Sequence, residues 1–251
     1  MEQRYRRMVS PSIGLEVESL ATDDVRLLLR VLAMIAFYDP EVDIADDMTR
    51  ILGDLDRRGA TRDEDRMRYI EFLVAARRLE DARRYENDHK TSRRPRIPSL
   101  DEQVARAMSA RGALVLDADG TSLVPAVVGA RDIEVVVVSS PLCSFSRHAM
   151  ASIEADPGLR DVMSRHGRWL MPVEGNLHIE SVRDWNATHP RMPMVYAYKE
   201  SQWPFIGSWD TPTFYFLRGG RVVATHTGWR SDADIAVLRR HLQTLGALSV
   251  E

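Results

Sequence analysis

A run of four valines at residues 135–138 constrains the fold of this chain more than any other feature. An unbroken apolar run is typical of a strand buried on both faces of a sheet, because a half-buried strand alternates apolar and polar residues. Cys143, the only cysteine, follows this run, and residues 147–153 then have the pattern of a helix. Backbone N–H groups and the dipole at a helix N-terminus stabilise a thiolate. Because there is no second cysteine, any redox chemistry needs another molecule's sulfur.

The bulk composition excludes several classes of protein. With 251 residues, the chain is long enough for one large domain or two small ones. A net charge of −3 gives no reason to expect a nucleic-acid partner. The apolar run at 31–37 is far shorter than the ~20 residues of a membrane-spanning helix. Charged residues also interrupt the first twenty positions, where a secretory signal would need an apolar core. We therefore expect neither a nucleic-acid partner nor a membrane span.

Apolar residues recur at a helical period through the first ninety residues. This period predicts helices that begin near Thr22, Ile44 and Thr61, and a shorter helix over residues 79–85. Thr22 is the expected cap of the first helix, and Thr61 with Glu64 forms a capping-box pattern at the third. The first part of the chain is therefore predicted to be all-α.

Residues 69–83 resemble the join between the two helices of a tetratricopeptide repeat. The match is shorter than one repeat and no clear second copy follows, so an ordinary α-hairpin bundle is the other interpretation. The basic stretch 87–98, with Arg93 at its centre, has the composition of a linker, although an electrostatic binding site is the alternative. We place a helical-hairpin module with its linker at residues 1–97.

Beyond residue 98 the pattern changes to alternating strands and helices. The expected elements are a helix at 101–110, a hairpin of 113–116 with 123–128, the strand 135–138, a helix after Cys143 that breaks at 156–158, a strand at 169–173, a helix at 179–186, a strand at 194–197, a hairpin of 214–217 with 222–225, and a helix at 232–245.

This order resembles the thioredoxin-like superfamily, and four features carry the resemblance. The tetrapeptide Cys143-Ser144-Phe145-Ser146 stands in the place of the family's CxxC motif, and Thr211-Pro212 matches its Thr-Pro before a strand. Gly228 and the early hairpin are similar to features of the TlpA-type branch. The resemblance implies an α+β/α/β fold, namely a thioredoxin-like domain at 98–251 with a central mixed sheet flanked by helices. It also implies that Pro212 is cis and lies beside Cys143.

The chain departs from that family in three ways, the first being that the loop lacks the tryptophan and the proline of a Cys-Gly-Pro-Cys-like motif. Ser146 replaces the second cysteine, which in dithiol enzymes resolves the mixed disulfide. Val137 stands six residues before Cys143, where thioredoxins have a buried acid, and Glu134 is too near the start of the strand to substitute on spacing. A hydroxyl cannot resolve a disulfide, so a partner thiol would have to do so.

The resemblance implies a monothiol thiol–disulfide oxidoreductase. Cys143 would attack a disulfide-bearing protein or a glutathione adduct, and Ser146 would hydrogen-bond to the thiolate. Thr211 and Pro212 would position the substrate chain. The candidate groove beside this site is formed by the apolar residues Leu142, Phe145 and Trp209. Core packing is the alternative role of the aromatic cluster from Trp203 to Trp209.

The second interpretation is a catalytically degenerate thioredoxin-like module that binds a protein partner. A protein partner for the N-terminal helices is expected in either case. Histidines are scattered without ligand spacing, so neither a metal nor a cofactor is expected. The TlpA-type resemblance implies a bacterial, periplasmic location. No export signal is visible in the sequence, so a cytoplasmic location is the alternative.

Overall fold

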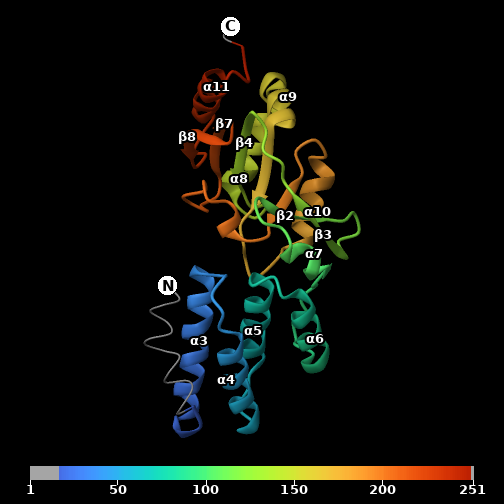
Figure 1. The fold of residues 1–251 in the computed structure, drawn as a ribbon, viewed down its shortest axis with the longest axis vertical. Helices are drawn as coiled ribbons and strands as arrows, with labels where there is room; N and C mark the ends of the chain where they lie inside the picture. Colours follow the sequence, from blue (N-terminus) through green and yellow to red (C-terminus); the bar gives the residue numbers. More distant parts are fainter. Residues whose placement is uncertain (1–16, 250–251) are drawn as a thin grey trace. The chain divides into compact units, whose positions relative to one another are not determined.

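The computed structural model describes residues 17–249 (Figure 1). They form two compact units. The first runs to Glu102 and includes Glu174–Leu177, and the second contains Gln103–Val173 and the chain from His178 onward.

The first unit is helical. Its elements are the short helix η1 (Val17–Ser19), the helices α3 (Thr22–Tyr38), α4 (Ala45–Arg57), α5 (Asp63–Ala75) and α6 (Leu79–His89), and the two-residue strand β1 (Ser99–Leu100). The apolar stripe of α3 is fully buried at Val25, Leu29 and Leu32, because α3 packs against both α4 and α5. The four predicted helices are present, and the resemblance to a tetratricopeptide repeat remains a prediction.

Two predicted helix caps are wrong by one residue. Ala21, rather than Thr22, is the N-cap of α3. At α5 the N-cap is Arg62, whose backbone N–H donates to the Asp65 carboxylate at 3.1 Å. The acid that closes the helix start is therefore Asp65 and not Glu64, because the helix begins one residue later than expected.

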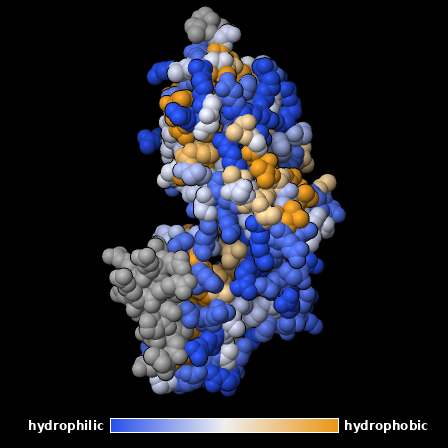
Figure 2. Space-filling view, viewed as in Figure 1, coloured by the Kyte–Doolittle hydropathy of each residue, from blue (hydrophilic) through white to orange (hydrophobic). Residues whose placement is uncertain are grey.

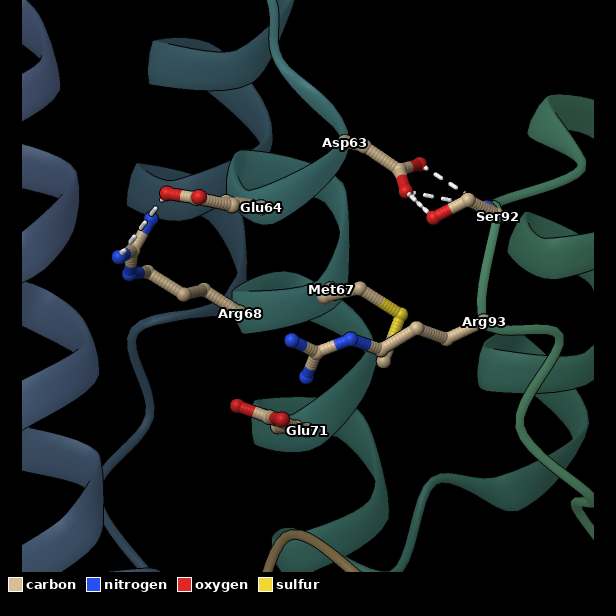
Figure 3. A pocket seen from close by; sticks show the side chains of 7 residues that line it. All are labelled: Asp63, Glu64, Met67, Arg68, Glu71, Ser92 and Arg93. Atoms are coloured by element: carbon tan, nitrogen blue, oxygen red, sulfur yellow. Dashed lines mark hydrogen bonds and ion pairs between the residues drawn. The ribbon is translucent and has the colours of Figure 1, made fainter.

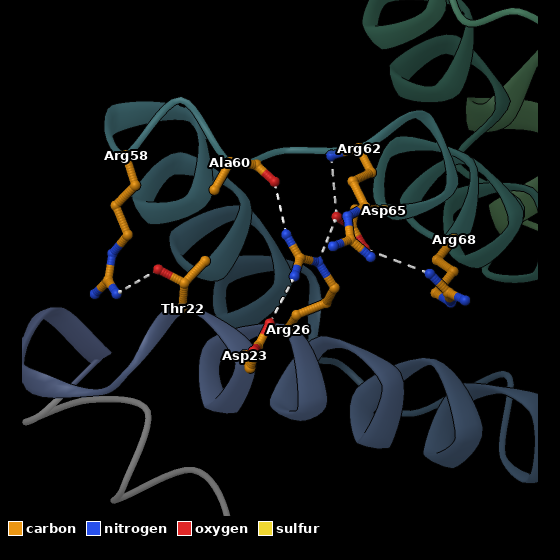
Figure 4. Close-up of polar contacts among 8 residues, drawn as sticks. All are labelled: Thr22, Asp23, Arg26, Arg58, Ala60, Arg62, Asp65 and Arg68. Atoms are coloured by element: carbon orange, nitrogen blue, oxygen red, sulfur yellow. Dashed lines mark hydrogen bonds and ion pairs between the residues drawn. The ribbon is translucent and has the colours of Figure 1, made fainter.

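A buried ion pair joins α3 to α5 (Figure 4). The Arg26 Nε atom lies 3.2 Å from Oδ2 of Asp65, and the two side chains are 5% and 0% exposed. Arg26 also donates to the Ala60 carbonyl at 2.7 Å and pairs with the exposed Asp23 at 3.1 Å. One guanidinium therefore ties the start of α3 to the loop before α5 and to the first turn of α5.

The second unit contains a mixed sheet. Its strands are β2 (Gly112–Leu116), β3 (Ser122–Val127), β4 (Ile133–Val138), β5 (Gly167–Met171), β6 (Met194–Ala197), β7 (Thr213–Arg218) and β8 (Arg221–Thr227). They are ordered β3-β2-β6-β5-β4-β7-β8. β4, β5 and β6 are parallel, whereas the β2–β3, β2–β6, β4–β7 and β7–β8 pairs are antiparallel.

The valine run forms a strand that is buried on both faces of the sheet, as predicted. Residues 135–138 are 0% exposed and lie on β4 between β5 and β7. The helix α8 (Ser144–Ala155) follows β4, and the β7–β8 hairpin and α11 (Ala233–Leu245) close the unit. This sheet order, with Thr211-Pro212 just before β7, confirms the thioredoxin-like fold preceded by a helical module.

The remaining helices are α7 (Glu102–Arg106), α9 (Pro157–His166), α10 (Ile179–Thr188) and the short η2 (Glu200–Gln202). The helix expected at 101–110 is thus much shorter. The predicted break at 156–158 is also the start of α9, which the sequence analysis missed. Asp156 caps it by accepting from the N–H groups of Gly158 and Leu159, and Pro157 suits a first helical position because it needs no N–H partner.

The helices α10 and α11 cover the same face of the sheet. Strand register places Trp169, Val135 and Phe216 on the same face. Trp169 packs against Trp185 of α10, and Phe216 packs against His241 of α11. The opposite face is covered near β4 and β7 by an irregular segment instead, where Phe205 packs against Tyr215 at 6.3 Å.

Candidate functional site around Cys143

Cys143 is the N-cap residue of α8. Its φ and ψ of −72° and 119° are extended, and its carbonyl accepts the first helical hydrogen bond, from the Arg147 N–H at 3.0 Å. Its own N–H donates to the Ser140 carbonyl at 3.2 Å, which holds the turn between β4 and α8. The thiol is partly exposed, so it lies at the helix N-terminus and within reach of solvent.

The fold brings Cys143 and Thr211 together. Sγ lies 3.3 Å from the Thr211 carbonyl oxygen, across a sequence separation of 68 residues. The Thr211–Pro212 peptide is cis, as the resemblance implies, and Pro212 is buried. The thiol donates to this carbonyl, so the contact belongs to the neutral form and is lost when the thiolate forms.

Ser146 is fully buried in the first turn of α8. Its hydroxyl oxygen accepts from the Ser140 N–H at 3.4 Å, which links the helix back to the loop before Cys143. Partial burial raises the pKa of the Cys143 thiol. Hydrogen bonds to the Thr211 side chain, to the N–H and hydroxyl of Ser146 and to the Phe145 N–H outweigh it, so the pKa lies below its ordinary value.

Nearby cations are held by other groups. Arg147 donates to the carbonyls of Pro141 and Leu142 at 2.9 and 2.8 Å, so its guanidinium braces the loop. His148 lies 3.7 Å from the Asp232 carboxylate. Hydrogen bonds at the helix start and to Thr211 therefore lower the thiol pKa.

Two apolar side chains flank the thiol. Leu142 and Phe145 are 50% and 54% exposed, which is unusual for residues of their size beside a buried strand. Trp209 is partly buried, and no described contact joins it to Cys143. Trp203 is 1% exposed and its indole N–H donates to the Gly112 carbonyl at 3.2 Å, so this member of the aromatic cluster packs in the core.

Glu134 forms two ion pairs that its position in the sequence does not predict. It is fully buried and accepts from Arg111 at 2.5 Å and from Arg168 at 2.7 Å. The Arg111 guanidinium in turn lies 4.9 Å from the Phe205 ring. Val137 occupies the position of the family's buried acid and is itself 0% exposed. Glu134 is therefore part of a structural ion-pair cluster.

A cavity of about 450 Å³ lies in the first unit, between α5 and residues 92–93 (Figure 3). Asp63 accepts from the Ser92 N–H at 3.0 Å, and Arg68 lies 3.9 Å from Glu64. Desolvation raises the pKa of Glu71, against the lowering effect of Arg68 and Arg93. The lining mixes both charges, so it favours no single class of ligand.

Two further properties concern residues 17–249 alone. These residues contain no group of three or more histidine, cysteine, aspartate or glutamate side chains placed to hold a metal ion. None of the helices in this range is long and apolar enough to cross a membrane.

No protein-family model matches the chain, and the comparison with curated proteins gives no match. Among solved structures, the chain is similar to one described as a thioredoxin-like protein from Bacteroides caccae. That alignment covers 88% of this chain and 78% of that chain, with 10% sequence identity and a TM-score of 0.36. A likeness this distant carries no information about activity, and the assignment of the fold rests on strand order and pairing.

Proposed function

We propose that the chain is a monothiol thiol–disulfide oxidoreductase that acts through Cys143. The observation that carries the proposal is a partly exposed thiol, with a lowered pKa, at the N-terminus of α8 and 3.3 Å from the Thr211 carbonyl. A lowered pKa increases the fraction of thiolate at neutral pH, and the thiolate is the attacking species.

The exchange would proceed in two balanced steps. The Cys143 thiolate attacks one sulfur of a substrate disulfide, a new S–S bond forms, and the other substrate sulfur leaves as a thiolate that takes up a proton. A thiol of a second molecule, of the glutathione type or from a partner protein, then attacks the mixed disulfide and releases Cys143. Ser146 would stabilise the thiolate in the first step.

The Thr211 backbone would guide an extended substrate. Once the thiol is consumed, the Thr211 carbonyl is free to accept from a substrate N–H, and main-chain pairing of this kind aligns a peptide. Leu142 in the loop before the thiol and Phe145 on α8 provide exposed apolar surface near it. We include the TlpA-type relationship and a periplasmic setting in this proposal.

The decisive experiment compares the native chain with Cys143→Ser in the glutathione-dependent reduction of a mixed-disulfide peptide. Ser144→Ala is a matched control, because Ser144 is exposed and adjacent to the thiol. We expect Cys143→Ser to abolish turnover and Ser144→Ala to retain it. Equal rates for the native chain and Cys143→Ser would refute the catalytic proposal. Ser146→Cys should add dithiol reductase activity if the site is otherwise intact.

A second candidate function is a protein-binding module without turnover. It is favoured by the replacement of the resolving cysteine by Ser146 and by the engagement of Glu134 with two arginines. In that case Cys143→Ser would bind the same polypeptide as tightly as the native chain, and the native chain would show no glutathione-dependent turnover.

A further inference from the structure

The second unit has a cavity of about 440 Å³ at the end of the sheet opposite Cys143. Its walls include Arg131 before β4, Gly167 at the start of β5 and Pro193 before β6. These positions mark the N-terminal ends of the parallel strands, whereas Cys143 follows the C-terminal end of β4. The cavity is therefore separate from the thiol site.

The floor of this cavity is apolar and belongs to the sheet face opposite α10 and α11. Strand register places Ala113, Val115, Ala126, Leu170 and Val195 on that face, and all five line the cavity. Val115 and its cross-strand neighbour Val124 are 39% and 54% exposed. Figure 2 shows hydrophobic residues gathered on the visible side of this unit beside the β2–β3 hairpin.

The rim of the cavity is positively charged. It contains Arg131, Arg168 and Arg191, and no aspartate or glutamate lines the cavity. Arg168 is paired with Glu134 at 2.7 Å, and Arg191 with Asp161 at 3.2 Å. Arg131 donates to the Arg165 carbonyl, a neutral group, and has no ion pair among the described residues. Its charge is therefore uncompensated, and a guanidinium retains further donors for an anion.

We propose that this cavity binds a small amphiphilic anion, with an unbranched apolar body on the valine and alanine floor and a carboxylate at Arg131. The apolar floor accounts for affinity through burial of hydrocarbon, and the arginine rim selects the charge of the head group. A volume of about 440 Å³ lies within the range of small-molecule sites. This site is independent of the proposed thiol chemistry.

The test is calorimetric titration of the full chain with decanoate, decanol and acetate, each below the concentration at which it aggregates. Saturable binding of decanoate is expected, with weaker binding of decanol and none of acetate. Arg131→Gln should weaken decanoate about fivefold, the effect of one exposed charge contact, and leave decanol unchanged. Arg160→Gln, at an exposed position of α9 outside the cavity, is the matched control and should bind as the native chain does.

A second pair of variants tests the floor. Val115→Glu and Val124→Glu add the same charge to facing positions of one strand pair, but only Val115 lines the cavity. Val115→Glu should weaken decanoate more than tenfold and Val124→Glu by less than threefold. The proposal is overturned if the native chain shows no saturable decanoate binding, if the two glutamate variants weaken it equally, or if Arg131→Gln has no effect. Arg131→Gln and its control Arg160→Gln leave the apolar floor intact, so they still test the proposal if a glutamate variant does not fold.

Discussion

Replacing Asp65 by asparagine should lower the free energy of unfolding of the first unit by about 3–5 kcal/mol, the usual cost of removing one partner of a buried ion pair. Asp65 is 0% exposed, and its carboxylate receives Arg26 at 3.2 Å and the Arg62 N–H at 3.1 Å. Asparagine keeps the shape but leaves the Arg26 charge buried without its main partner. Since domains are stable by only about 5–15 kcal/mol, this loss is a large share of the total.

Asp23→Asn is the matched control, because Asp23 pairs with the same guanidinium at 3.1 Å while its own side chain is 95% exposed. Exposed pairs contribute about 0–1 kcal/mol. The assay is urea unfolding followed by far-ultraviolet circular dichroism, with tryptophan fluorescence in parallel. All five tryptophans lie in the second unit, so their fluorescence reports that unit separately. Equal losses for Asp65→Asn and Asp23→Asn would refute the reasoning, as would a shift confined to the fluorescence transition.

Three further outcomes are expected. The rate of Cys143 alkylation should rise with pH through a midpoint below that of a free cysteine, because the folded pKa is lowered and the thiolate is the reactive form. Ser146→Ala should move that midpoint upward, and an unchanged pH profile would contradict the role of the hydrogen bonds. Glu134→Gln should lower the free energy of unfolding of the second unit by about 3–5 kcal/mol in the fluorescence-detected urea transition, since two guanidinium groups lose their shared carboxylate. A loss below about 1 kcal/mol would contradict the stabilising role of these buried ion pairs. Leu142→Ala combined with Phe145→Ala should slow the rate of exchange with an apolar disulfide peptide by about tenfold, because these exposed side chains would contact the peptide. The rate with a small symmetrical disulfide should stay unchanged. Equal effects on both substrates would show that these residues form no substrate groove.

Elements with a strong local pattern were predictable. The valine run, the two hairpins and the helices α3 to α6 each carry their periodicity within a short window, because burial on one face or on both imposes it directly. Helix starts were less certain. Ala21 and Arg62, rather than the predicted Thr22 and Thr61, hold the N-cap positions, because the ends of helices are specified less sharply by local sequence than their buried faces.

The candidate site was predictable only in part. Cys143 and Ser146 are close in sequence, so their placement at a helix start follows from a local pattern. The approach of Thr211 came from the family resemblance and could not be obtained from spacing. The buried cluster of Arg111, Glu134 and Arg168 was missed, because each member lies on or beside a different strand and no local signal connects them.

The amino-acid sequence alone was sufficient for most of the helices and strands, for the strand buried on both faces and for the single thiol at a helix start, because these depend on near neighbours in the chain. Tertiary structure decided which distant groups meet: the Thr211 carbonyl at the thiol, the Asp65 carboxylate at Arg26, and the arginines around an apolar floor. The meeting at the thiol and the arginine rim depend on strand order and register, and the Asp65–Arg26 pair depends on the packing of α3 against α5.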